Sequence, residues 1–373
     1  MTDPRAPSLP PRTIALAAGG TGGHLFPAEA LARELLARGH EVVVYTERRG
    51  ATYTKALDGL PFVVLPARSL AGGIVGKLAA ALTIARAVWR ARADMRRRGV
   101  DLLIGFGGYP SFAPALAAKS RCLPLLLHEQ ATRLSVANRQ LLRLADALAI
   151  SFPSIAGTDG FDAARITVTG NPVRRDILAA RADYPALSAG TPLQLLVVGG
   201  SQSARVFGEI VPPALLALPE AIRRHLTLSL QYTGDNDAIA ARLRDAGIAA
   251  DIRPFFDDMG ARLAAAHLVI TRAGASTAAD LLTVGRPAIF VPIPLGGSRD
   301  EQRRNADTLA AAGVGWCLPE PELSVAVLTT MLADLFASTN RLPQAAAAAA
   351  ALAQPQAAAN LADLVETLLR TSR

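Results

Sequence analysis

A glycine-rich turn that ends in a histidine lies near the start of this 373-residue chain. It reads Gly19-Gly-Thr-Gly-Gly-His24, follows the apolar residues 14–18 and precedes a helical pattern. A strand that enters such a turn and continues as a helix directs backbone N–H groups toward one point, where an anion such as a diphosphate can bind. The imidazole at the end of the turn titrates near neutral pH, so it could accept a proton from a substrate hydroxyl.

A second turn of the same kind occurs in the second half, where residues 195–198 run into Gly199-Gly-Ser-Gln202. Each half also has a later glycine-containing turn after a strand-like run. These later turns are Gly105-Phe-Gly-Gly-Tyr-Pro-Ser111 and Thr271-Arg-Ala-Gly-Ala-Ser-Thr277. The repetition indicates two domains of similar design, each with an anion-binding turn.

Short β-rich runs alternate with Ala/Leu/Arg-rich helical patterns along both halves, which is typical of βαβ units and parallel sheets. We expect an α/β protein of two doubly wound, Rossmann-like domains that face each other across a cleft, with ligands at the carboxyl ends of both sheets. The predicted domains are residues 1–171 and 172–340, followed by a helical segment, 341–373, that packs back toward the N-terminal domain. The predicted strands are 12–18, 41–46, 62–65, 101–105, 124–128, 146–150, 193–198, 227–232, 250–253, 267–271, 287–291 and 314–318.

Composition narrows the class of protein. Hydrophobic residues make up 51% of the chain and charged residues 19%, which supports sizeable cores. The two cysteines suit a reducing, cytoplasmic setting, no apolar run reaches the length of a membrane span, and residues 1–12 do not resemble a secretory signal.

The formal charge is +9 over residues 1–172 and −1 over residues 173–373. The excess predicts that the first half meets a polyanion, either nucleic acid or an anionic membrane face.

Two other nucleotide-binding motifs are absent. A dinucleotide fingerprint needs a third glycine where this chain has Leu25, and a triphosphatase loop needs a Gly-Lys-Ser/Thr ending. The sequence therefore argues against a nicotinamide enzyme and against a nucleoside triphosphatase.

Six motifs then occur in order at suitable separations. They are Gly19-Gly-Thr-Gly-Gly-His24, Phe106-Gly-Gly-Tyr109, His128-Glu-Gln130, Gly170-Asn-Pro-Val-Arg174, Gly199-Gly-Ser-Gln202 and Phe256-Asp-Asp-Met259. Together they resemble the MurG family of GT-B glycosyltransferases. The resemblance implies inverting transfer of N-acetylglucosamine from UDP-N-acetylglucosamine to the undecaprenyl-linked muramoyl-pentapeptide, lipid I to lipid II, in peptidoglycan synthesis. It also implies a part in cell-wall biogenesis, cell shape and cell division, and neither a cofactor nor a catalytic metal.

The resemblance also implies site residues. We interpret His24 as the general base on the sugar hydroxyl, with His128 and Glu129 as competing candidates. The backbone of Phe256 is implied to read uracil. The implied donor-binding residues are Thr21, Gly22, Gly23, Ala131, Arg174, Ser201, Gln202, Phe256, Ala275, Ser276, Thr277, Asp280 and Gln302. The implied acceptor-binding residues are Tyr109, His128, Glu129 and Asn138.

Four positions depart from the family pattern. Ala131 stands where an asparagine usually bonds the donor sugar, and whether the amide of Asn138 substitutes for it is left open. Asp280 stands in place of a ribose-binding glutamate, so its reach is one methylene shorter. Ser203 replaces a glycine, and Glu301 differs from a glutamine present in some relatives.

The tripeptide Asp235-Asn-Asp237 matches the D-x-D motif of metal-dependent transferases of another fold class. Its position after Gly234 favours capping of the following helix instead. We therefore expect no metal site there.

Residues 68–98 combine apolar and basic side chains at helix-compatible spacing. The apolar members are Ile74, Leu78, Leu82 and Trp89, and the basic members are Lys77, Arg86, Arg90, Arg92, Arg96, Arg97 and Arg98. Such a helix suits adsorption onto anionic headgroups, although the stripe could instead face the domain's own sheet. With the lipid-linked acceptor implied by the resemblance, we predict a peripheral protein at the cytoplasmic face of the inner membrane. Nucleic-acid binding is not expected, because no reading module is present.

Other functions share these features. A UDP-N-acetylglucosamine 2-epimerase has the same fold but would modify the free donor without an acceptor, and a GT-B transferase could use another lipid acceptor. A nucleotide-binding module without activity is the non-enzyme alternative, which Ala131 keeps open.

Overall fold

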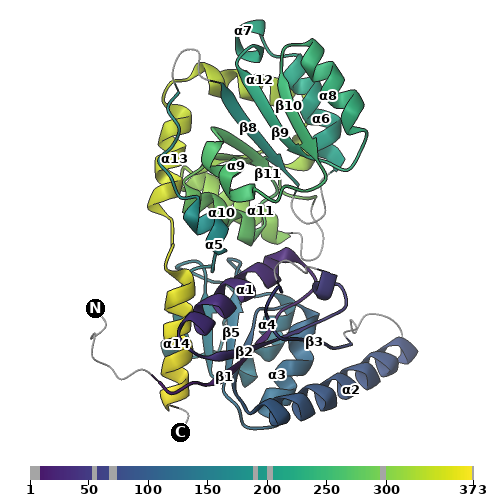
Figure 1. Cartoon of the computed structure of the whole chain (residues 1–373), viewed down its shortest axis with the longest axis vertical. Coiled ribbons are helices and arrows are strands. Elements are labelled where there is room, and N and C mark those ends of the chain that lie inside the picture. The colour runs from purple at the N-terminus through teal and green to yellow at the C-terminus, as the bar shows by residue number, and fades with distance from the viewer. Residues whose placement is uncertain are drawn as a thin grey trace. The chain divides into compact units, whose positions relative to one another are not determined.

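The structure is a computed structural model and describes residues 9–52, 57–66, 74–187, 192–199, 205–294 and 300–371 (Figure 1). The chain divides into two compact units. One extends to Arg174 and resumes at Gln356, and the other runs from Arg175 to Pro355. The predicted C-terminal segment, 341–373, is therefore shared between the two units.

Among the described residues, the first unit contains a seven-stranded parallel sheet of order β3-β2-β1-β4-β5-β6-β7. Its strands are β1 (Thr13–Ala17), β2 (Glu41–Thr46), β3 (Phe62–Val64), β4 (Val100–Gly105), β5 (Leu125–Glu129), β6 (Ala147–Ile150) and β7 (Ile166–Val168). Its helices are α1 (Gly22–Ala37), α2 (Ile74–Arg98), α3 (Phe112–Lys119), α4 (Val136–Leu141) and α14 (Ala357–Thr371). Short 3-10 helices lie at Gly50–Thr52, Tyr109–Ser111, Leu142–Leu144 and Ala163–Arg165.

The second unit has, within its described part, a six-stranded parallel sheet of order β10-β9-β8-β11-β12-β13. Its strands are β8 (Leu193–Val198), β9 (Leu226–Gln231), β10 (Ala249–Arg253), β11 (Leu268–Thr271), β12 (Ala288–Phe290) and β13 (Gly315–Cys317). Its helices are α5 (Arg175–Ala179), α6 (Arg205–Leu216), α7 (Glu220–Arg223), α8 (Asn236–Asp245), α9 (Met259–Ala265), α10 (Ala275–Val284), α11 (Asp300–Ala311), α12 (Val325–Ala337) and α13 (Arg341–Ala351). A 3-10 helix lies at Glu320–Glu322.

The predicted fold class, two Rossmann-like α/β domains, is confirmed, and each predicted strand has a counterpart in one of the two sheets. Strand β7 was not among the strands predicted from the sequence. This strand lies at the edge of its sheet and is three residues long, with two of them exposed. It therefore lacks the buried run that marks β1, β2, β4, β5 and β6.

The interior strand β1 shows that both faces of the first sheet are covered. Successive side chains of a strand point to opposite faces. Ile14 and Leu16 pack into one core together with Val365 of α14. Ala15 belongs to the other core, which includes Ala91 of α2. After Thr13 the strand is entirely apolar, because helices cover both faces of the sheet.

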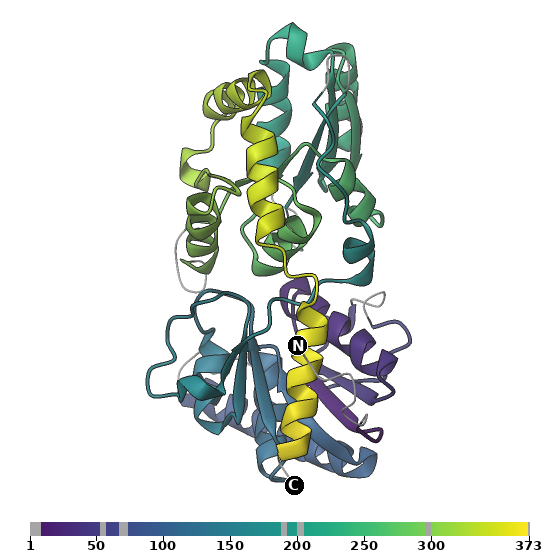
Figure 2. The same ribbon diagram turned by 90° about the vertical axis from the view of Figure 1, so that its left-hand side faces the viewer.

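The C-terminal helix α14 completes the first unit, where it packs along α1 (Figure 2). Arg38, which follows α1, fixes this contact. Its Nη1 donates to Asp363 Oδ1 at 2.6 Å and to Glu366 Oε1 at 3.2 Å, and its Nη2 donates to the carbonyl of Ala359 at 3.1 Å. Helix α13 instead packs against α10 in the second unit.

A fully buried arginine, Arg286, links α9, α10 and the segment after α5 within the second unit. Its guanidinium donates to the carbonyls of Leu263 (2.9 Å) and Ala264 (2.6 Å) at the end of α9, and to that of Val284 (2.7 Å) at the end of α10. It also reaches the carbonyl of Asp183, after α5, at 3.1 Å. One side chain therefore satisfies the carbonyl ends of two helices and ties them to the segment that enters this unit.

The strand order of each sheet reverses direction at one point, between β1 and β4 in the first and between β8 and β11 in the second. Ligands of doubly wound folds bind outside the carboxyl ends of the strands at this point. The glycine-containing turns of the sequence follow these strands.

None of the helices described for this chain is long and apolar enough to cross a membrane.

Candidate active site

The first glycine turn connects β1 to α1, as the sequence predicts. Gly20 has a φ of +74°, and a Cβ on Gly19 would lie 2.2 Å from Cγ of Pro110. Thr21 has extended backbone, and the helix begins at Gly22. The helix N-terminus therefore stands at the carboxyl end of β1, where its dipole favours a negatively charged group.

Two glycines after β4 face the ring of His24. Gly107 and Gly108 have φ values of +84° and +75°. A Cβ on Gly107 would lie 3.6 Å from Cε1 of His24, and one on Gly108 would lie 3.5 Å from its Cδ2. The imidazole therefore lies against this turn, whose left-handed backbone favours glycine.

The His24 side chain is suited to proton transfer. Burial lowers the pKa of its imidazole below the ordinary 6.5, while the Phe106 carbonyl and the Gln130 side chain act in the opposite direction. Its Nδ1 is buried and meets no hydrogen-bond partner among the described residues. The ring is therefore neutral near physiological pH and can take up a proton.

Two side chains link the strand ends around this histidine. The buried hydroxyl of Ser111 lies 2.8 Å from the carbonyl oxygen of Ala17 and 2.7 Å from that of Gly107. Gln130 Nε2 donates to the carbonyl of Phe106 at 3.0 Å. The carboxyl ends of β1, β4 and β5 are thereby held together.

His128, in β5, is fully buried, with Nε2 3.0 Å from the carbonyl oxygen of Gly170 and its ring centroid 5.3 Å from that of Phe106. Burial lowers the pKa of His128 to about 4. The Gly170 carbonyl raises this pKa and the neighbouring His24 lowers it further. His128 is therefore neutral, and its Nε2–H donates to Gly170.

Glu129 is buried and accepts hydrogen bonds from the loop that follows β5. The donors are the backbone N–H groups of Ala131 (3.3 Å) and Ser135 (2.8 Å) and the Nδ2 of Asn138 (2.9 Å). Burial raises the pKa of Glu129, and these hydrogen bonds lower it in part. The carboxylate therefore acts as an anchor for the loop.

Asn138 is also fully buried, and its Nδ2 donates both to Glu129 and to the carbonyl of His128 (3.0 Å). Both amide hydrogens are thus used inside the unit. The amide group of Asn138 is therefore not available as a donor in place of the asparagine missing at Ala131, which is itself buried. Tyr109 differs from these residues, because 58% of it is exposed.

Arg174 lies at the end of the first unit's main segment and covers the ring of Phe26 in α1, with Cζ 4.5 Å from the ring centroid. Such cation–π stacking fixes the plane of the guanidinium. Its predicted contact with the donor stays a prediction.

In the second unit, β11 leads through Gly274 into α10, which begins at Ala275 and includes Ser276, Thr277 and Asp280. The turn is held from α11, because the buried Asn305 donates through Nδ2 to the carbonyl of Ala273 at 3.0 Å. The predicted donor residues of this segment thus share the first turns of one helix.

Phe256 and Gln302 also lie in described segments of the second unit. Phe256 follows β10 and is buried, and Gln302 in α11 accepts the N–H of Ile293 at 3.3 Å. Ser201 and Gln202, predicted to hold the diphosphate, lie outside the described residues, as does Ser203.

Asp235 caps α8, as predicted, because its side chain accepts the N–H of Ala238 at 3.1 Å. Among the residues that the structure describes, no group of three or more His, Cys, Asp or Glu side chains could hold a metal ion.

Three supporting residues were missed by the sequence reading: Ser111, Asn305 and Arg262. Ser111 ends a motif that was recognised for its glycines and its tyrosine, and Asn305 carries no local signal. Arg262 stands four residues after Asp258, a spacing that indicates a helical ion pair but says nothing of its stacking on Phe256.

The chain matches known protein families and curated proteins along most of its length. The chain matches the glycosyltransferase family 28 N-terminal domain over residues 14–150 and the C-terminal domain of the same family over residues 194–365. It is 46% identical to the UDP-N-acetylglucosamine–N-acetylmuramyl-(pentapeptide) pyrophosphoryl-undecaprenol N-acetylglucosamine transferase of Rhodospirillum centenum, with 94% of this chain and 93% of that protein covered. The protein of the same name from Granulibacter bethesdensis is 43% identical, with 97% and 95% covered.

Solved structures agree. The crystal structure of MurG from Acinetobacter baumannii is similar with a TM-score of 0.76 at 30% identity, covering 96% of this chain and all of that one. A putative UDP-N-acetylglucosamine 2-epimerase from Listeria monocytogenes reaches a TM-score of 0.68 at 17% identity, covering 97% of each chain, so it shares the fold alone.

The lowered pKa of His128 predicts a pH-dependent loss of stability. As pH falls, the unfolded chain takes up the proton near 6.5 and the folded chain only near 4, so the stabilisation is complete above pH 6.5 and is lost toward pH 4. A His128→Gln variant can still donate to Gly170 but does not titrate. Between pH 8 and pH 5, we expect the wild type to lose about 2 kcal/mol more of its free energy of unfolding than this variant.

Urea denaturation at the two pH values measures this difference. His225→Gln, which removes an exposed imidazole, is the matched control and should follow the wild type. Parallel losses in the wild type and His128→Gln would contradict the assignment.

Proposed function

We propose that this chain, which belongs to the MurG family of N-acetylglucosamine transferases within glycosyltransferase family 28, transfers N-acetylglucosamine from UDP-N-acetylglucosamine to the undecaprenyl-linked muramoyl-pentapeptide. The observation that carries the proposal is the match, over 94% of the chain, to a transferase whose name states this reaction. The chain would thus serve peptidoglycan synthesis and, through it, cell shape and division.

The second unit is proposed to bind the donor. The N-terminal end of α10, with Ala275, Ser276 and Thr277, is suited to the diphosphate, because a helix N-terminus stabilises negative charge. Asp280 would reach the ribose hydroxyls, Gln302 the sugar, and the backbone of Phe256 the uracil. Ser201 and Gln202 are assigned to the same diphosphate on the resemblance alone.

His24 is proposed as the general base. The bond between the anomeric carbon and the diphosphate oxygen breaks while the acceptor oxygen forms a bond to the same carbon from the opposite side. The hydroxyl proton passes to His24, and UDP leaves with the bonding electron pair. Support comes from the neutral imidazole and its place beside the helix N-terminus, where Thr21, Gly22 and Gly23 would contact the donor.

The two competing candidates for the base are less suited to the role. His128 and Glu129 are buried, and each is engaged by groups of its own unit: Gly170 for the histidine and the loop after β5 for the carboxylate. We assign both to the support of the acceptor site, together with Asn138. The exposed phenol of Tyr109 is the member of this set that an acceptor can reach.

Helix α2 is proposed to contact the membrane surface. Its described side chains begin at Ala80, so Ile74, Lys77 and Leu78 of the predicted stripe lie outside them. Leu82 is 54% exposed and Trp89 71% exposed, which argues against the alternative that these two residues face the sheet.

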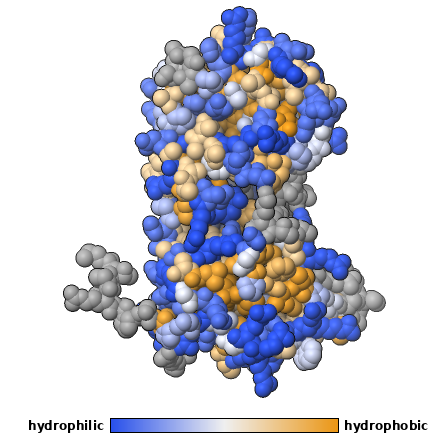
Figure 3. Space-filling model, in the orientation of Figure 1, coloured by the Kyte–Doolittle hydropathy of each residue, from blue (hydrophilic) through white to orange (hydrophobic). Residues whose placement is uncertain are grey.

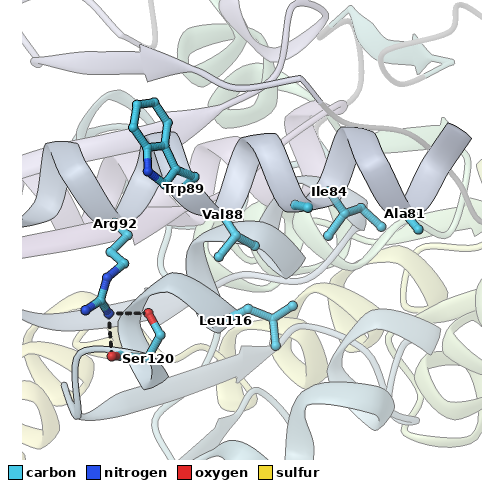
Figure 4. Close-up of a pocket in the computed structure, with 8 residues that line it drawn as sticks. Ala81, Ile84, Val88, Trp89, Arg92, Leu116 and Ser120 are labelled. Carbon is cyan, nitrogen blue, oxygen red and sulfur yellow. Dashed lines mark hydrogen bonds between the residues drawn. The ribbon is translucent and has the colours of Figure 1, made fainter.

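A shallow groove of about 760 Å³ runs between α2 and α3 beside Trp89 (Figure 4). Its lining is mainly apolar and ends at Arg92, which donates to Ser120 Oγ at 2.7 Å. In the view of Figure 1, hydrophobic surface is exposed on the unit that carries α2 (Figure 3). Arg86 and Arg90 are exposed at helical spacing from Leu82, so apolar and cationic groups meet anionic headgroups together. This arrangement supports peripheral attachment to the cytoplasmic face of the inner membrane.

The reaction itself is the first test. With UDP-N-acetylglucosamine labelled in the sugar and the lipid-linked muramoyl-pentapeptide, we expect the label to enter the solvent-extractable lipid with release of one UDP per sugar. Label that remains in a water-soluble sugar nucleotide, with the acceptor unchanged, would instead indicate an epimerase or an inactive module. Transfer to a different glycolipid but not to this acceptor would also reject the proposal.

Replacement of the proposed base should remove turnover but keep donor binding. We expect His24→Ala to lower kcat by about 10²–10⁴-fold and to leave the affinity for UDP unchanged. Because burial lowers the pKa of His24, the acid limb of the wild-type kcat profile should lie below pH 6.5. His225→Ala is the control and should behave as the wild type. Near-normal turnover in His24→Ala would remove this residue from the role.

Charge placed in the exposed stripe should weaken membrane binding. We expect Leu82→Glu combined with Trp89→Glu to lower cosedimentation with phosphatidylglycerol vesicles by roughly tenfold or more, because the buried apolar area is lost and anionic lipids repel the new carboxylates. Val327→Glu, at an exposed valine of α12, should have no effect. Equal binding of all three proteins would contradict the proposal.

A further inference from the structure

Arg262, in α9, is held by acceptors from three different elements. Its Nε donates to Asp258 Oδ1 at 2.8 Å, its Nη1 to Ser229 Oγ in β9 at 2.8 Å, and its Nη2 to Asp251 Oδ2 in β10 at 2.6 Å. The side chain is 14% exposed. Three hydrogen bonds in one plane fix both the position and the tilt of a guanidinium.

The face of this fixed guanidinium covers the ring of Phe256, with Cζ 3.9 Å from the ring centroid. Phe256 is 2% exposed, so its ring has no freedom to turn into solvent. A desolvated cation over an aromatic face is the stronger form of this interaction. The Phe256 ring is therefore held in place by Arg262 of α9; this contact is called the clamp below.

The clamp acts on the backbone of the whole segment 254–258. Gln231 Nε2 donates to the carbonyl of Pro254 at 3.2 Å, which fixes its start, and the bond of Arg262 to Asp258 fixes its end. The same bond lowers the pKa of the Asp258 carboxyl below its ordinary value. Because the rotamers open to a side chain depend on φ and ψ, a fixed Phe256 ring between two fixed segment ends limits the directions of the Phe256 N–H and C=O.

We propose that Arg262 is a positioning residue of the nucleotide site, which holds the peptide groups of Phe256 in the orientation that pairs with the edge of a uracil. This assignment rests on the proposed function, in which Phe256 reads the base of a uridine diphosphate sugar. It adds that base selection depends on a side chain that does not touch the nucleotide. Hydrogen bonds to a base edge are directional, so a small rotation of the Phe256 peptides weakens them.

The test compares UDP with CDP, which differ at the base edge and share the ribose and the diphosphate. We expect calorimetry to show that the wild-type protein binds UDP more tightly than CDP. Arg262→Met should weaken UDP binding by about tenfold and leave CDP binding within about twofold, so that discrimination is lost. Arg262→Lys, which keeps the charge without the planar face, should lie between the two.

The matched control is Arg253→Met. Arg253 shares the carboxylate of Asp251, at 2.7 Å, and is 59% exposed, but it is bonded to Asp251 rather than stacked on Phe256. This variant should discriminate as the wild type does. If Arg262 had a purely structural role, Arg262→Met and Arg262→Lys would lose stability, but the ratio of the UDP and CDP affinities would not change.

A second variant covers the case in which Arg262→Met does not fold. Phe256→Leu keeps the backbone and the apolar burial and removes the aromatic face, so it should reduce discrimination in the same direction. Full discrimination in Arg262→Lys and in Phe256→Leu would overturn the assignment and leave the proposed function intact. A wild-type protein that binds UDP and CDP equally would reject the proposed donor, and the assignment with it.

Discussion

The contact between the His24 ring and the Gly107–Gly108 backbone is the constraint on which the site of the first unit depends. Both glycines of this turn have a positive φ, a backbone conformation that residues with a Cβ rarely adopt. The turn in turn depends on the parallel pairing of β1 with β4, which brings the carboxyl ends of these strands together. The His24 side chain is thus placed by sheet register and by a turn whose backbone favours glycine, together with its interactions with the Phe106 carbonyl and the Gln130 side chain.

Around this contact, buried polar groups are matched to backbone groups of the same unit. The Ser111 hydroxyl lies within hydrogen-bond distance of two carbonyls, and His128 donates to the carbonyl of Gly170. The carboxylate of Glu129 accepts hydrogen bonds from the loop after β5. These groups are buried and cannot hydrogen-bond to water. If one partner of such a bond is removed, the other is therefore left without a hydrogen bond. The arrangement therefore specifies one geometry of the strand ends, which the proposed proton transfer to His24 requires.

The parts of the fold that depend on residues close together in the sequence could be predicted. Apolar runs predicted all but one of the described strands, and the glycine turns with the adjacent His24 predicted the sheet edge at which the site is proposed. The supports of that edge could not be predicted in this way. Ser111 bonds to Ala17, 94 residues earlier, and Asn305 to Ala273, 32 residues earlier. Such pairs depend on which strands become neighbours, and local periodicity carries no information on that order.

The net charge of a segment does not show how its individual arginines act. Residues 173–373 have a formal charge of −1, yet they contain Arg286 and Arg262, whose guanidinium groups fix backbone segments inside the unit. Burial lowers the pKa of Arg286, which is bonded to backbone carbonyls. Arg262 has its pKa raised despite burial, because two carboxylates face it. One arginine is thus held by backbone carbonyls and the other by two carboxylates and a hydroxyl, so the same residue type binds neutral groups in one place and forms ion pairs in the other.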